Sequence, residues 1–99
     1  MRLLAELLEA AASETPAGGR SVSYEPVGWV WIKPGARRRR ERDEPGGSRV
    51  IETLIAEARR DPRLNLGRVL RVSGGDWRLA TVADGEDAGR VKLTLERDR

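Results

Sequence analysis

The sequence predicts a small, mainly β, antiparallel domain, and three observations support that prediction. The chain has 99 residues, the length of one domain. Its last third alternates apolar and polar residues between turns rich in Gly and Asp, as a β-meander does. A second alternating segment, residues 22–32, carries two of the three tryptophans. We therefore expect one domain over residues 1–99, with a long charged loop at residues 36–49 and at most one short helix.

Residues 1–12 are the candidate for that helix. Leu3, Leu4, Leu7 and Leu8 recur at the spacing of one helical face, and the Ala and Glu residues between them favour helix. The Pro and Gly residues that follow interrupt any regular element. The alternative is a strand imposed by the tertiary surroundings, because helix propensity is a weak preference.

The first predicted strand carries a pair of tryptophans. Trp29 and Trp31 alternate with Val30 and Ile32, so both indole rings project from one face. The chain has no Phe, and large aromatic side chains commonly fill a core. We therefore expect Trp29, Trp31 and Trp77 to be structural core residues. The alternative is an exposed platform on which nucleic-acid bases stack.

The segment 36–49 has no apolar periodicity and is expected to be a mobile loop. Positive charge concentrates there: residues 33–49 carry a net charge of +4, whereas the rest of the chain carries −1. Clustered guanidinium groups bind phosphate backbones without reading base sequence, whereas the alternative is a solvated loop that keeps the chain soluble. In either case the charges are expected to add little to stability. The arginines concerned are Arg37, Arg38, Arg39, Arg40, Arg42 and Arg49.

Residues 68–96 are predicted to form three alternating strands joined by two polar turns. Val91, Leu93 and Leu95 share one face of the last strand and are expected in the core, with the intervening polar side chains outward. Residues 50–60 are ambiguous, because their apolar residues suit either a helical stripe or a strand buried on both faces.

Composition excludes most catalytic chemistry. The chain has no Cys and no His, so it has no thiol nucleophile, no imidazole base and no zinc site of the usual kind. Its clustered carboxylates lie in polar turns without metal-ligand spacing, and its Gly-Gly turns do not match a phosphate-loop pattern. No apolar run is long enough to span a membrane. We therefore expect no enzymatic activity, no cofactor, no metal and no membrane partner.

From residue 18 onward the chain carries an ordered series of strand and turn motifs. They are Gly18-Gly19, Val22-Ser23-Tyr24-Glu25, Trp29-Val30-Trp31-Ile32-Lys33-Pro34-Gly35 followed by arginines, Glu52-Thr53-Leu54-Ile55-Ala56-Glu57-Ala58-Arg59, Arg68-Val69-Leu70-Arg71-Val72, Gly74-Gly75, Trp77-Arg78-Leu79 and Val91-Lys92-Leu93-Thr94-Leu95-Glu96. This series resembles the head-tail joining proteins of tailed phages and gene transfer agents, which act as adaptors or stoppers. That family usually begins with a strand, whereas residues 1–12 here favour helix.

The resemblance implies a small antiparallel β-barrel or sandwich-like domain that forms a ring at the capsid-tail junction, with a hexamer favoured over a dodecamer. Portal and adaptor proteins would lie above the ring, and tail terminator and tail tube proteins below it. Double-stranded DNA would pass through without sequence recognition. The loop 36–49 would occupy the position of the family's channel plug, which makes its arginines the expected DNA-channel or interface residues.

The resemblance also implies a location in a virion or phage-like particle, after synthesis in the bacterial cytoplasm. Two alternatives remain open from the residues alone. One is a free-standing small β-barrel that binds nucleic acid through the arginine segment and exposed tryptophans. The other is a small toxin-like or regulatory domain with no distinguishing feature.

Overall fold

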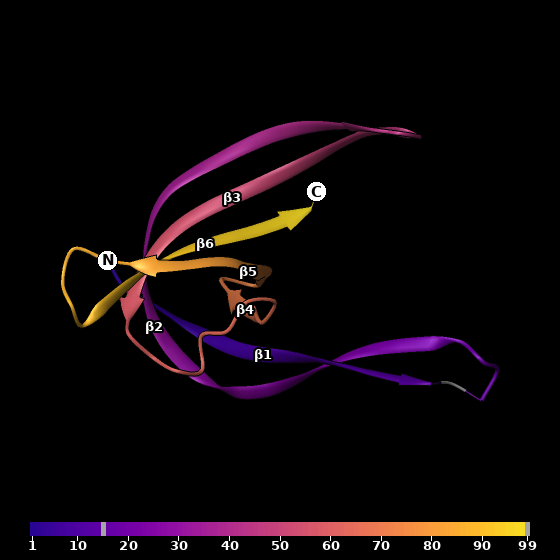
Figure 1. The fold of residues 1–99 in the computed structure, drawn as a ribbon, viewed down its shortest axis with the longest axis horizontal. Coiled ribbons are helices and arrows are strands. Elements are labelled where there is room, and N and C mark those ends of the chain that lie inside the picture. Colours follow the sequence, from indigo (N-terminus) through magenta and orange to yellow (C-terminus); the bar gives the residue numbers. More distant parts are fainter. Residues whose placement is uncertain (15, 99) are drawn as a thin grey trace.

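The computed structural model describes residues 1–14 and 16–98, which form one antiparallel sheet of six strands (Figure 1). The strand order β1-β2-β3-β6-β5-β4 returns to β1, so the sheet closes on itself as a barrel. This confirms the prediction of a small, mainly β, antiparallel fold. The strands are β1 (Leu3–Glu14), β2 (Arg20–Glu44), β3 (Gly47–Arg59), β4 (Val69–Val72), β5 (Gly75–Asp84) and β6 (Arg90–Asp98).

The candidate helix at residues 1–12 does not form: Leu3–Glu14 is strand β1, which was the alternative left open for this segment. Ala5 and Leu7 point into the barrel and are fully buried, so the leucine-rich segment satisfies the two-residue period of a strand once it pairs with β2 and β4. The ambiguous residues 50–59 belong to strand β3, which pairs with β2 on one side and with β6 on the other. The described part of the chain contains no helix at all, and hence none that could cross a membrane.

β2 is 25 residues long and belongs to two successive hairpins. Its register shifts twice, once opposite Leu7 and Leu8 near Pro26 and Gly28, and once between Pro34 and Arg37. Proline removes a donor from the hydrogen-bond ladder, and bulges increase local twist. β2 can therefore bend at both places and pass from one hairpin to the next around the barrel.

The hydrophobic core fills the interior of the closed sheet. Leu93 and Leu95 are fully buried, and Val91 and Trp77 are 3% exposed. All four belong to one contiguous cluster of buried side chains, as expected for them from the sequence. Across the β5–β6 hairpin, Leu79 lies directly opposite Leu95.

Two hairpins extend beyond the barrel at the same end (Figure 1). The N-terminal arm consists of residues 9–14 of β1 and 20–25 of β2, which pair with each other. The arginine arm consists of residues 37–44 of β2 and 47–54 of β3. The N-terminus and the β5–β6 turn lie at the opposite end. The radius of gyration of 15.0 Å exceeds the roughly 13 Å of a compact domain of this size because the arms project.

Candidate functional site

The predicted loop at residues 36–49 is wrong, because this segment is a β-hairpin. β2 and β3 pair from Arg37 opposite Leu54 out to Glu44 opposite Gly47, which leaves a two-residue turn of Pro45 and Gly46. Gly46 has a φ of 101°, a left-handed conformation that glycine adopts after proline in tight turns. The hydrophobic pattern of the sequence did not predict these strands, because most side chains of the exposed hairpin have no core to pack against.

Strand alternation divides the arginine run between the two faces of the arm. Arg37 and Arg39 share a face with Glu52, the buried charged side chain of β3. Arg37 Nε lies 3.2 Å from Glu52 Oε2, and Arg39 Nη2 lies 3.5 Å from Glu52 Oε1. Arg38 and Arg40 project from the other face, are exposed, and form no ion pair within the part of the chain that the structure describes.

A cation–aromatic cluster fixes the base of the arm to the barrel. Arg97 donates to Glu52 over 3.2 Å, and its guanidinium lies 4.3 Å from the centre of the Trp77 ring. The Arg37 guanidinium lies 5.1 Å from the same ring. Such cation–π contacts add to the ion pairs. Gly75 permits the arrangement, because a Cβ at that position would collide with Arg97.

The two remaining arginines of the predicted segment lie near the tip. Arg49 Nη1 is 3.4 Å from Asp98 Oδ2, with both side chains more than half exposed. Arg42 lies directly opposite Arg49 in the backbone register, but its side chain is outside the described part of the structure. The arm therefore places Arg38 and Arg40 on one face and ties Arg37 and Arg39 to the fold on the other, a division that the sequence analysis missed.

The prediction that Trp29 and Trp31 are core residues is wrong. They are 57% and 60% exposed, whereas Trp77 is buried. Both faces of this strand are apolar, so alternation alone does not reveal which face turns inward. Val30 and Ile32 take the inward face and belong to the core cluster.

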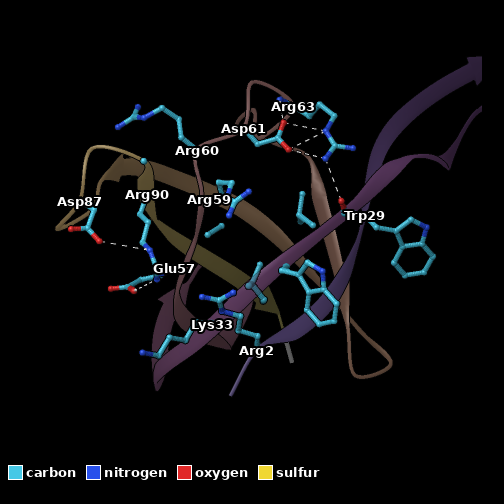
Figure 2. A pocket seen from close by; sticks show the side chains of 15 residues that line it. Arg2, Trp29, Lys33, Glu57, Arg59, Arg60, Asp61, Arg63, Asp87 and Arg90 are labelled. Carbon is cyan, nitrogen blue, oxygen red and sulfur yellow. Dashed lines mark hydrogen bonds and ion pairs between the residues drawn. The ribbon is translucent and has the colours of Figure 1, made fainter.

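A cavity of about 540 Å³ lies at the end of the barrel opposite the arms. Figure 2 shows its lining, in which basic side chains predominate. Arg90 pairs loosely with Glu57 and Asp87, at 3.9 and 3.8 Å. The cations Arg2, Lys33 and Arg59 form no ion pair with any described residue.

Arg63 fastens the loop between β3 and β4 to this wall. Arg63 donates to both carboxylate oxygens of Asp61, the shortest contact being 2.7 Å, and to the carbonyl oxygen of Trp29 over 3.2 Å (Figure 2). The hydrogen bonds from Arg63 hold the pKa of Asp61 below its ordinary value of 3.8. A Cβ on Gly28 would overlap the end of the Arg63 side chain, so glycine leaves room for this guanidinium beside β2.

Neither region assembles catalytic machinery in the residues that the structure describes. No group of three or more His, Cys, Asp or Glu side chains there is arranged to hold a metal ion. The carboxylates at both ends face arginines across ordinary ion pairs. The features with functional potential are therefore surfaces: the arginine arm, the exposed tryptophans and the basic cavity.

Comparison with known proteins gives a likeness in fold to a solved structure. No family model matches the sequence, and no curated protein matches it. Among solved structures, the chain is similar to a chain of a structure described as "Virion of native gene transfer agent (GTA) particle". The TM-score is 0.73 at 20% sequence identity, over 97% of this chain and 93% of that chain. The likeness therefore shows that this protein shares its whole fold with a chain of that particle.

Proposed function

We propose that this protein is a structural, non-enzymatic subunit of a phage-like or gene transfer agent particle. It would form a stopper or adaptor ring where the capsid meets the tail. The observation that supports this most is the likeness to a chain of a gene transfer agent virion, which extends over 97% of this chain and 93% of that chain. The partners would be further copies of the chain, a hexamer favoured over a dodecamer, with portal and adaptor proteins above and tail terminator or tail tube proteins below.

The arginine arm is proposed to line or plug the DNA channel of that ring. Arg38 and Arg40 are exposed on one face and form no ion pair in the described chain, so they are available to phosphates. Guanidinium–phosphate contacts hold DNA without reading its sequence. A channel needs this property, because base-specific contacts would obstruct DNA movement.

Particle production by the host bacterium tests the proposal. A strain lacking the gene should release few tail-bearing, DNA-filled particles, and the wild-type gene should restore them with the protein in the purified particles. The double change Arg38→Ser and Arg40→Ser should lower the yield of DNA-filled particles, whereas Arg38→Lys with Arg40→Lys should largely preserve it. Both variants should melt like the wild type, because exposed charges contribute under about 1 kcal/mol each. Normal particles without the protein would refute the proposal.

A second candidate is a free-standing nucleic-acid-binding barrel, and the exposure of Trp29 and Trp31 favours it specifically. The bases of single-stranded nucleic acids stack on exposed aromatic rings of this kind, which lie on a barrel strand beside basic side chains. Fluorescence titration of the isolated protein with a single-stranded oligonucleotide tests this candidate. Binding that persists above ~0.2 M salt and is lost in Trp31→Ala would support it, because a purely phosphate-driven contact weakens steeply there.

A further inference from the structure

The outer wall of the barrel carries an apolar surface with no partner in the described chain. Leu4 lies directly opposite Trp31, and Glu6 opposite Trp29, across the β1–β2 ladder, so these side chains share one outward face. Leu4 is 45% exposed and the two tryptophans more than half exposed. Leu4, Trp29 and Trp31 are here called the tryptophan face. Exposed indole side chains beside arginines are the composition of interface hot spots.

Cations border this face. Arg2, Lys33 and Arg59 line the adjoining cavity and form no ion pair with any described residue. The cavity also contains carboxylates, and Figure 2 shows Glu57 and Asp87 among its basic side chains. Basic side chains outnumber these carboxylates, and Glu57 and Asp87 are already paired with Arg90. The lining therefore has a net positive charge, which a segment of negative charge on another protein chain would complement.

The N-terminal arm has the complementary character. Ala10 and Ala12 lie opposite Tyr24 and Val22 in the β1–β2 register, and all four side chains are exposed on one face. Its two strands carry three acidic residues and one arginine, a net charge of −2. An isolated two-stranded hairpin is marginally stable in water. This arm therefore exposes apolar surface that a partner would both cover and stabilise.

Arg2, Asp87 and Arg90 line the cavity, and Figure 1 shows that the N-terminus and the β5–β6 turn lie at the end of the molecule opposite the N-terminal arm. Two complementary surfaces at opposite ends of one chain make a head-to-tail contact, which repeats from copy to copy and closes into a ring when the rotation per copy allows.

We infer that the N-terminal arm of one subunit docks on the tryptophan face of the next copy of this chain. Val22 and Tyr24 pack against Trp29 and Trp31, and the acidic charge of the arm faces the unpaired cations beside them. The inference rests on the proposed function, because it describes how the proposed ring is held together.

Cross-linking between engineered cysteines tests this contact. The chain has no natural cysteine, so only the engineered residues of this protein can react. Val22→Cys on the arm and Glu57→Cys beside the cavity are combined in one chain, assembled into particles and treated with a short bismaleimide. The expected result is a ladder of covalent multimers. The matched control combines Val22→Cys with Ser48→Cys, at the tip of the arginine arm, and should give no ladder. Particles that contain the protein but yield no ladder from the first pair overturn the inference and leave the proposed function intact.

A second variant separates docking from folding. Trp29→Ala with Trp31→Ala should keep the wild-type melting temperature, because both rings are exposed, yet reduce the yield of cross-linked multimer about tenfold or more, as loss of an interface hot spot does. An unchanged cross-link yield overturns the inference. Unchanged cross-linking together with lost binding to a single-stranded oligonucleotide would instead assign the tryptophan face to nucleic acid. Wild-type particles that lack the protein altogether would refute the proposed function.

Discussion

Glu52 holds the base of the arginine arm against the barrel. Its side chain is 3% exposed and faces Arg37, Arg39 and Arg97 at 3.2 to 3.5 Å. We predict that Glu52→Gln lowers the free energy of unfolding by about 2–3 kcal/mol, because it leaves converging cations without their anion. Urea denaturation measures the change. Glu41→Gln, on an exposed part of the same arm, is the matched control and should be nearly silent; equal effects would contradict this role.

Asp61 makes a pH-dependent contribution to stability. Hydrogen bonds from Arg63 hold the pKa of Asp61 below 3.8, so the stabilisation is complete above 3.8 and is lost as the pH falls through the lower, folded value. We predict that Asp61→Asn costs about 1 kcal/mol at pH 7, as expected for a partly exposed ion pair. The difference from the wild type should shrink as the pH falls below 3.8. Melting curves from pH 7 to 2 check this, and a difference independent of pH would contradict it.

The loss of stability on replacing a tryptophan should depend on how deeply that tryptophan is buried. Trp77→Ala removes a ring that is 3% exposed and supports Arg97, so we predict a loss of about 3–5 kcal/mol. Trp31→Ala removes an exposed ring and should cost less than about 0.5 kcal/mol. Thermal melting of the isolated subunit distinguishes them. A Trp31→Ala protein that unfolds would show that the ring packs against its own chain.

At the scale of elements, β6 shows the clearest division between inner and outer face. Leu93 is fully buried and Lys92 is exposed. We predict that Leu93→Asp abolishes folding, because it places a charge in the barrel interior, whereas Lys92→Asp is nearly neutral. Circular dichroism of the purified variants measures the outcome. Similar effects from the two changes would mean that the register of β6 differs from the one described.

The strands differ in how far the sequence predicts them, for physical reasons. β6 alternates strictly and lies between clear turns, so its inner face was evident from Val91, Leu93 and Leu95. For β1 the choice between helix and strand stayed open because Leu7 and Leu8 are adjacent: Leu7 faces the core, while Leu8 lies at the register shift and is also buried. The arginine arm was mistaken for a loop because ion pairs and backbone pairing, which leave no hydrophobic period, hold it in place.

For the whole molecule, the structure combines a closed barrel with two projecting arms, and these should differ in local stability. Opening a barrel strand such as β4 or β6 breaks core packing, whereas the outer N-terminal arm at residues 9–14 is paired only with β2. We predict that amides of the arm exchange roughly a thousandfold faster than those of β6 in the isolated subunit, which corresponds to about 4 kcal/mol less opening free energy. Hydrogen exchange with mass spectrometry measures this difference.

Assembly into particles should remove much of the difference in exchange rate between the arms and the barrel, because the arms have the fewest contacts within their own chain. In purified particles, exchange in the N-terminal arm should slow toward the barrel rate if a neighbouring subunit covers it. Exchange at the tip of the arginine arm should slow only if DNA or another subunit contacts it, so comparing DNA-filled with empty particles separates those two contacts. Arms that are already as protected as β6 in the isolated subunit would contradict the expectation that they are completed by partners.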